Sequence, residues 1–299
     1  MRVSVVVPCY NATDFIGATL RSILSQVLPP GWDLEVLVVD DGSTDSSAEV
    51  LAELDHPELT VLAQPNSGNV AARNLALDRA TGDVVAFCDA DDVWYPGKVV
   101  AQLGVLGEDG SACCCAVRYL SPAGDVLATR GVGMDEATVR RLVVEEFVMP
   151  VPLSGWAFRR STSGLQLRMD EGLPVGADFE LALRASLFGR VSYVPRPLVG
   201  YRVHSTSITS SRLVTQQQVR RFLMARQAGD PAAEAGFHGW ATGRRRPWTE
   251  RTEDFSARQV RRGADAWAAG ARGRAGLHFL AAAGTSPRSS WRKARRVAL

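Results

Sequence analysis

The sequence lacks the features that identify several large classes of proteins. No apolar run reaches the roughly 18 residues that a membrane-spanning helix needs, and the start MRVSVVVP is too short an apolar run for a signal peptide. The 5 cysteines have no metal-ligand spacing, and three of them are consecutive, Cys113 to Cys115. Clustered, unpaired thiols are typical of a protein core in a reducing compartment. We therefore expect a cytoplasmic protein.

Two common phosphate-binding motifs are also absent. No G-x-G-x-x-G follows the first expected strand, and G-x-x-x-x-G-K-[ST] occurs nowhere. The GVG at 131–133 has no third glycine and follows no convincing strand. These absences argue against a nicotinamide-dependent dehydrogenase and against a P-loop nucleotide hydrolase.

Charge divides the chain into two parts, although the formal net charge is only +2. Residues 215–299 hold 17 Lys and Arg and 6 Asp and Glu, whereas residues 1–214 hold 17 and 26. We predict one domain over 1–214 and a basic, mainly helical appendage over 215–299. The simpler interpretation of the appendage is a packed, solvated helical pair. The more specific interpretation is a peripheral contact with the anionic inner face of a membrane. Binding to nucleic acid is disfavoured because no binding motif accompanies the charge.

Strands and helices alternate over the first 90 residues. Short apolar runs rich in β-branched residues predict buried strands, and apolar residues at helical spacing predict helices between them. The alternation predicts an α/β fold with a mostly parallel open sheet flanked by helices. The expected strands are 4–7, 35–39, 59–63 and 83–88, with helices over 14–27, 44–54 and 67–80. We further expect a hairpin (112–120 and 126–128), helices over 135–147 and 178–188, a strand over 191–194, and a loop over 148–177.

Polar residues follow each of the first four expected strands. In open α/β sheets ligands bind at the carboxyl ends of the strands, so these residues predict a site at one edge of the sheet. The four segments are PCYN (8–11), DDGS (40–43), QPNSG (64–68) and DADD (89–92).

Asp89 and Asp91 place two carboxylates two residues apart directly after an apolar strand. Oxygen ligands suit Mg²⁺ or Mn²⁺, and one or two carboxylates plus substrate phosphates is the usual arrangement for Mg²⁺. A bound cation would also relieve the repulsion between the carboxylates. The alternative interpretation is a solvated acidic turn.

Taken together, six segments resemble the family-2 inverting glycosyltransferases of GT-A fold. They run in the family's order from residue 3 to about 209, about 70% of the chain. The segments are VSVVVPCYNATDFIGATLRSILSQ, LEVLVVDDGSTDSS, QPNSGNVAARNLAL, ATGDVVAFCDADDVWYPGKV, DFELALR and VPRPLVGYRVHSTSIT. The resemblance implies transfer of a sugar from a nucleoside-diphosphate sugar, with UDP-sugars favoured, to an acceptor hydroxyl with inversion, assisted by Mn²⁺ or Mg²⁺.

The resemblance also assigns residues to the donor site. It implies a pocket for the nucleotide base, contacts beside the base and diphosphate, a ribose and sugar contact at Asp89, and a metal ligand at Asp91. Asp92 is expected to support the turn. The base-pocket residues are Pro8, Tyr10, Asn11 and Asp40, and those beside the diphosphate are Gly68 and Arg73.

The segment GADFELALR resembles the helix start that carries Glu-Asp in the family, where the Asp is the catalytic base. Asp178 matches the base, but Ala177 replaces the Glu, which puts in doubt whatever that Glu would orient. A carboxylate at a helix start is also a common structural cap. In YRVH, the resemblance suggests Arg202 as a diphosphate contact and His204 as a metal ligand.

Two further functions stay open. A catalytically inactive nucleotide-sugar-binding protein is compatible with Ala177, and a sugar nucleotidyltransferase would need a Gly-rich basic loop where PCYNATD stands. QVRRF at 218–222 resembles the Q-x-x-R-W signature of processive polysaccharide synthases. Those enzymes carry transmembrane channels, which this sequence lacks, so we expect transfer of single sugars.

Overall fold

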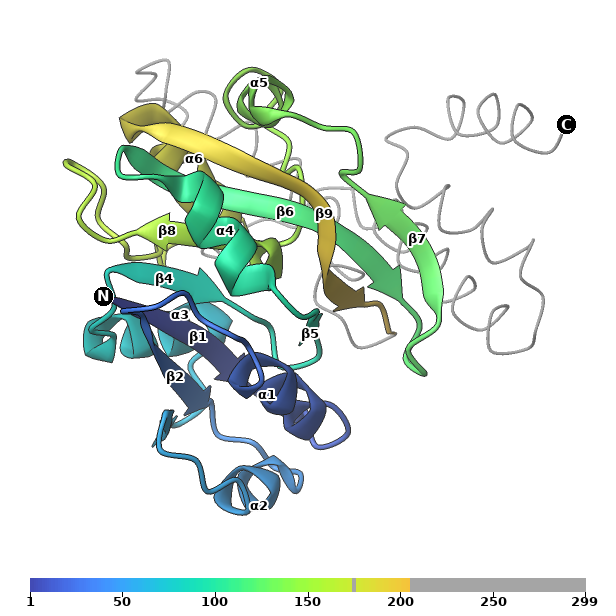
Figure 1. The fold of residues 1–299 in the computed structure, drawn as a ribbon. Coiled ribbons are helices and arrows are strands. Elements are labelled where there is room, and N and C mark those ends of the chain that lie inside the picture. The colour runs from blue at the N-terminus through green and yellow to red at the C-terminus, as the bar shows by residue number, and fades with distance from the viewer. Residues whose placement is uncertain (174–175, 205–299) are drawn as a thin grey trace, which may run out of the picture. The chain divides into compact units, whose positions relative to one another are not determined.

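The computed structural model describes residues 1–173 and 176–204 (Figure 1). The chain forms two compact units. The first unit comprises Met1–Tyr119, Ala128–Gly172 and Ala177–Tyr201, and the second comprises Leu120–Leu127, Leu173–Gly176 and Arg202–Leu299. The predicted boundary between residues 214 and 215 and the helical appendage lie outside the described residues and stay predictions.

The first 90 residues alternate strands and helices as predicted. The elements are β1 (Arg2–Cys9), α1 (Ile16–Leu24), β2 (Asp33–Asp40), α2 (Ser47–Ala52), β3 (Leu59–Ala63), α3 (Asn69–Arg79) and β4 (Val84–Phe87). The elements that follow are β5 (Val93–Trp94), α4 (Lys98–Leu106), β6 (Gly110–Leu120), β7 (Val126–Arg130), α5 (Glu136–Arg140), the π-helical turn η1 (Arg141–Glu145), the 3₁₀ turn η2 (Leu153–Gly155), β8 (Trp156–Arg159), α6 (Ala177–Phe188) and β9 (Arg190–Arg202).

The strands of the described residues form one mixed sheet in the order β3-β2-β1-β4-β8-β6-β9-β5, with β7 paired to β6. β1 pairs in parallel with β2 and β4, and β2 pairs in parallel with β3. The pairs β4–β8, β6–β8 and β5–β9 are antiparallel. The predicted α/β class is confirmed, and the parallel pairing lies in the half of the sheet that the N-terminal strands build.

The strand order creates a switch point between β1 and β4. The chain steps from β1 to β2 to β3 in one direction and then returns to the other side of β1 to form β4. Right-handed crossovers therefore place α1 and α2 on one face and α3 on the other, where α3 packs on β1 and β2. The connections after β1 and after β4 leave in opposite directions, and ligands bind in the crevice at such a point.

The cysteines are core residues, as predicted. All 5 are buried and free of disulfides, and the three consecutive ones lie on β6, whose two faces are both covered. Burial raises the pKa of Cys113 to about 12, so this thiol stays protonated at neutral pH.

Lys98, the first residue of α4, is a charged residue in the protein core. Its side chain is fully buried, and its Nζ donates to Gln102 Oε1 at 2.6 Å and lies 3.7 Å from the centroid of the Trp94 ring. Burial lowers the pKa of Lys98. The amide and the indole face compensate part of the cost of burying the ammonium.

Candidate functional site

The strand register brings the predicted polar segments to one edge of the sheet. Cys9 at the end of β1 lies opposite Asp40 at the end of β2, and Asp40 lies opposite Ala63 at the end of β3. On the other side of β1, Val6 lies opposite Phe87, the last residue of β4. The segments after these four strands therefore begin at neighbouring points of the same edge.

Hydrogen bonds join the loops after β1 and β2. Asn11, whose φ is +50°, donates its N–H to Ser43 Oγ at 3.0 Å and accepts the Thr44 N–H at 2.8 Å. Asp40 Oδ1 accepts the Ser43 N–H at 3.0 Å. The two loops thus form one surface, on which the ring of Tyr10 is 49% exposed.

Asp45, in the loop after β2, makes a second link to the loop after β1. Its carboxylate accepts the Thr13 N–H at 3.2 Å and the Ser47 Oγ–H at 2.5 Å. Burial raises the pKa of Asp45, but the hydrogen bonds from Ser47 and Thr13 together outweigh it and lower the pKa to about 2. The carboxylate therefore stays charged at neutral and mildly acidic pH, and its hydrogen bonds to Thr13 and Ser47 persist over that range.

Asp41 fixes the loop after β3. Its carboxylate is buried and accepts the Gln64 Nε2–H at 2.7 Å and the backbone N–H groups of Ser67 and Gly68, both at 2.8 Å. A carboxylate that accepts three such donors holds their backbone firmly. Gly68, with φ +90°, comes immediately before α3, so Asp41 also fixes where that helix begins.

An ion pair connects α3 with the turn after β4. Arg73 Nη2 lies 2.5 Å from Asp89 Oδ1, and the exposed fractions of the two side chains are 8% and 30%. The Nε atom of Arg73 is buried and has no hydrogen-bond partner among the described residues. Arg73 therefore has one buried N–H donor that no described residue satisfies.

The carboxylates at this edge influence one another. Burial raises the pKa of Asp89 above its ordinary value, the Arg73 guanidinium opposes this, and the negative charges of Asp91 and Asp178 add to the rise. Asp178 stands at the start of α6, far along the chain from Asp89. Its charge contributes to the rise in the pKa of Asp89, so the two carboxylates are near enough to interact electrostatically.

The start of α6 is tied to α3 through the loop that precedes it. Asn74, next to Arg73 and buried, donates to Met169 O at 3.0 Å and accepts the Met169 N–H at 2.9 Å. From α6, Arg184 donates to Arg168 O at 2.6 Å. Consecutive residues of α3 therefore bind the turn after β4 and the loop before α6.

Asp178 has one local hydrogen bond, in which its Oδ1 accepts the Phe179 N–H at 2.8 Å. Its side chain is partly exposed. The arrangement satisfies one free donor of the helix start and leaves an oxygen that can accept a proton.

A family model described as glycosyl transferase family 2 matches residues 4–189, which is more than half of the chain. The chain belongs to glycosyl transferase family 2. The resemblance seen in the sequence is thereby confirmed, and family membership assigns the chain to the glycosyltransferase enzymes.

Curated relatives are named as glycosyltransferases or polysaccharide synthases. An uncharacterized glycosyltransferase from Nostoc is 27% identical over 74% of this chain and 71% of its own length. TuaG from Bacillus subtilis, a putative teichuronic acid biosynthesis glycosyltransferase, is 42% identical over 37% of this chain and 44% of its own. The chondroitin synthase of Pasteurella multocida is 26% identical over 76% of this chain and 23% of its own. The chain thus spans less than half of the last two proteins.

Solved structures confirm the GT-A fold. TarS from S. aureus, crystallised with UDP-GlcNAc, matches with a TM-score of 0.60 at 17% identity over 94% of this chain and 91% of its own. The mannosyltransferase PcManGT from Pyrobaculum calidifontis, in complex with GDP-Man and Mn²⁺, matches with a TM-score of 0.56 at 22% identity over 94% and 86%.

The described residues fit a divalent cation whose remaining ligands come from the substrate. They contain no group of three or more His, Cys, Asp and Glu side chains that could hold a metal ion. Asp89 and Asp91 offer two carboxylates at the switch point, and a cation bound by one or two carboxylates and by substrate phosphates needs no third protein ligand. Arg202 and His204 belong to the second unit, where Arg202 donates to Pro122 O at 2.9 Å, so their roles stay predictions.

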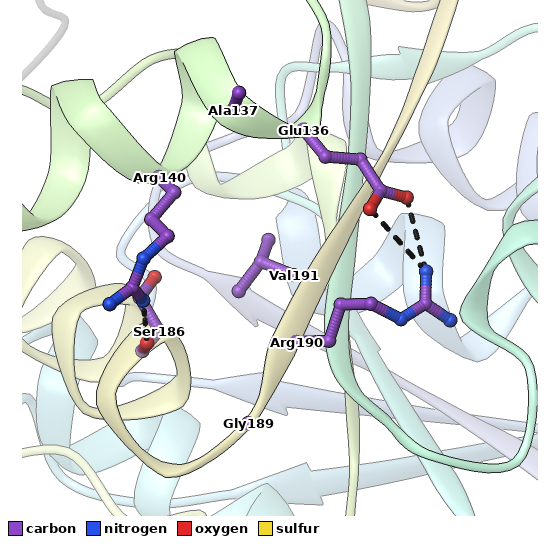
Figure 2. A pocket seen from close by; sticks show the side chains of 7 residues that line it. All are labelled: Glu136, Ala137, Arg140, Ser186, Gly189, Arg190 and Val191. Atoms are coloured by element: carbon purple, nitrogen blue, oxygen red, sulfur yellow. Dashed lines mark hydrogen bonds and ion pairs between the residues drawn. The ribbon is translucent and has the colours of Figure 1, made fainter.

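A separate pocket lies between α5 and the junction of α6 and β9 (Figure 2). Its charged walls are engaged in internal contacts: Arg140 donates to Ser186 O at 2.8 Å, and Arg190 pairs with Glu136 at 3.1 Å. None of the residues that the sequence assigned to the site lines this pocket. The strand-end edge is therefore the candidate active site.

No helix of the described ranges, 1–173 and 176–204, is long and apolar enough to cross a bilayer.

Asp41→Asn is expected to lower the free energy of unfolding by about 2 kcal/mol, because the new amide would turn an N–H towards a buried donor that Asp41 now satisfies. The amides of Ser67 and Gly68 should exchange with solvent faster than in the wild type. Denaturant unfolding and hydrogen exchange measure the two effects. Asp55→Asn, at an exposed aspartate, is the matched control. Wild-type exchange at Ser67 and Gly68 would contradict the role given to Asp41.

Proposed function

We propose that this chain transfers a sugar from a nucleoside-diphosphate sugar to an acceptor hydroxyl, with inversion and with the help of Mn²⁺ or Mg²⁺. One observation carries the proposal. The donor-site residues predicted after β1 to β4 begin at one edge of the sheet, and the charge of Asp178 acts on Asp89 at that edge. These observations support a donor-binding surface at this edge with Asp178 as a proton acceptor near it.

The nucleotide would bind across the ends of β1 and β2. Tyr10 offers an exposed ring, and Asn11 and Asp40 are held in place by Ser43. Pro8 lies just inside the same strand end. A ring beside a fixed carboxylate suits a base that presents an N–H, which uracil, thymine and guanine all do.

The diphosphate would bind near the start of α3. Gly68 leaves room for a close approach of backbone, since a Cβ placed there would meet no atom within 4 Å. Arg73 pairs with Asp89 through Nη2, and its guanidinium would be shared between Asp89 and phosphate oxygens. TarS has been crystallised with UDP-GlcNAc, and the PcManGT structure contains GDP-Man, which supports a donor of this chemical class.

Asp91 would hold the divalent cation, with Asp89 contacting the ribose and sugar. When bound, the cation supplies positive charge where the diphosphate leaving group becomes more negative. Arg73 supplies a second positive charge to the same group. The Mn²⁺ in the PcManGT complex supports a cation of this type.

Asp178 would take the proton of the acceptor hydroxyl as the hydroxyl oxygen attacks the anomeric carbon. The bond from that carbon to the diphosphate breaks on the opposite side, so the configuration inverts. A positioned base raises the rate by about 10²- to 10⁴-fold in typical enzymes. The acceptor would approach from the side of α6 because Asp178 is its first acidic residue.

The test uses the full chain and a panel of UDP-, GDP- and dTDP-sugars with Mn²⁺. We expect at least one of them to raise the melting temperature, by about 2–4 °C for each 1 kcal/mol of stabilisation, and then to be consumed with release of the nucleoside diphosphate. Release of pyrophosphate instead would support a nucleotidyltransferase. Stabilisation without consumption would support the nucleotide-sugar-binding protein that Ala177 leaves open. A peripheral membrane contact through residues 215–299 and a cytoplasmic location stay predictions.

A further inference from the structure

Asp92 is the member of the acidic turn that faces the protein interior. Its side chain is fully buried, and its N–H donates to Asp89 O at 3.1 Å, which closes the turn. Its Oδ2 lies 2.5 Å from the hydroxyl of Ser154, which is also fully buried. A buried carboxylate requires such donors, because an uncompensated charge in the interior is costly.

The Ser154 hydroxyl makes two bonds whose directions are fixed. The Asp89 N–H lies 3.0 Å from Ser154 Oγ and can only donate, so the hydroxyl oxygen accepts there. A serine hydroxyl has one proton, which is left for the Asp92 carboxylate. Ser154 therefore connects the backbone at the first aspartate of the turn with the side chain at the last one.

Ser154 is itself held in place by neighbours that are buried. It lies in η2, where the Gly155 N–H donates to Pro152 O at 2.9 Å and Gly155 O accepts from Gln102 Nε2 at 2.8 Å. The same Gln102 side chain accepts from Lys98. A chain of buried hydrogen bonds thus runs from Lys98 through Gln102 to η2.

We propose that Ser154 is a positioning residue that holds Asp89 and Asp91 in the geometry that binds the donor and its cation; this inference rests on the proposed function. The turn carries three carboxylates within four residues, and their repulsion favours opening it. Ser154 opposes this opening from beneath, while Thr19 Oγ1 holds the middle of the turn by donating to Ala90 O at 2.8 Å. The backbone just before Asp91 is thereby held at Asp89 and at Ala90.

The test measures how strongly Mn²⁺ promotes nucleotide binding. Calorimetric titrations of UDP, of GDP and of dTDP, at several Mn²⁺ concentrations and in EDTA, are compared between the wild type and Ser154→Ala. We expect the variant to need about 10- to 100-fold more Mn²⁺ for half-maximal nucleotide affinity, the range found when groups that orient metal ligands are removed. Its affinity in EDTA should equal that of the wild type, because the base pocket after β1 and β2 is untouched.

Ser111→Ala is the matched control. Ser111 is also a fully buried serine, and its hydroxyl bonds the carbonyl groups of Ala185 and Arg190. The control should lose stability but keep the wild-type Mn²⁺ dependence. Where Ser154→Ala does not fold, Ser154→Ala/Asp92→Asn replaces it, since the double variant also removes the charge that the serine proton served, and the same Mn²⁺ shift is expected.

Three results would overturn the inference. An unchanged Mn²⁺ dependence in the Ser154 variant would show that the turn keeps its geometry without the hydroxyl. Equal losses of affinity with Mn²⁺ and in EDTA would show general loosening instead of positioning. A wild-type chain that binds none of UDP, GDP and dTDP at any Mn²⁺ concentration would overturn the proposed function and this inference with it, which distinguishes the two failures.

Discussion

Asp178→Asn should lower turnover by about 10²- to 10⁴-fold, the usual contribution of a positioned base, and leave donor binding almost unchanged. The amide has the shape of the carboxylate but cannot accept the acceptor proton at neutral pH. The rate is measured as release of nucleoside diphosphate from the sugar nucleotide that stabilises the wild type. Donor affinity is measured separately by calorimetry, so that loss of chemistry and loss of binding are seen apart.

Asp135 offers a matched control for the interpretation of Asp178 as a helix cap. Asp135 is the N-cap of α5, and its side chain accepts the Thr138 N–H at 2.8 Å. Asparagine caps helices about as well as aspartate, so Asp135→Asn should keep both stability and activity. If Asp178 only caps α6, its variant will behave like the Asp135 variant. Near wild-type turnover in Asp178→Asn would thus remove it as the base.

The sequence was informative about the edge where the strands end. Each of the first four strands is a short apolar run followed at once by polar residues, and parallel pairing with right-handed crossovers leaves few ways to arrange such units. The ends of β1, β2 and β3 therefore had to fall at one level, as the register from Cys9 to Asp40 to Ala63 shows. Prediction worked here because each strand and the polar residues that end it are encoded by neighbouring residues in the sequence.

The parts that the sequence did not reveal depend on partners far apart in the chain. Ser154 and Asp92 are separated by 62 positions, and Asn74 and Met169 by 95. β8 was expected as part of a loop because it is short and lies in a segment rich in Pro, Gly and Ser, yet it pairs with both β4 and β6. Packing against neighbours, and no local pattern, decides such a strand.

Asp41 shows the same limit within a motif that was recognised. DDGS was identified as a site segment, and Asp40 was assigned to the base on resemblance. The structure shows that Asp41 is the buried acceptor for three donors of the loop after β3. Two adjacent aspartates thus have different roles because consecutive residues at a strand end point to opposite sides.

The architecture of the acidic turn determines how the cation should bind. Asp89 and Asp91 provide two carboxylates at the turn, and a cation bound by two carboxylates takes its other oxygen ligands from water or substrate. A diphosphate would add the missing oxygens. Cation and nucleotide should then bind cooperatively, and by linkage each must raise the affinity of the other by the same factor.

Mn²⁺ should therefore raise the affinity for the nucleoside diphosphate by about 5- to 150-fold, the usual range of coupling between two ligands, and EDTA should abolish turnover until Mn²⁺ or Mg²⁺ is restored. Asp91→Asn should reduce the coupling factor towards one, because it removes the charged ligand. Calorimetry with Mn²⁺ varied at fixed nucleotide, and the reverse, measures both sides of the cycle. Asp83→Asn is the control. Asp83 precedes β4, at the end of the strand away from the acidic turn, and its carboxylate accepts the Arg2 N–H. Full activity in EDTA would exclude a metal role, and unchanged coupling in Asp91→Asn would move the metal ligand elsewhere.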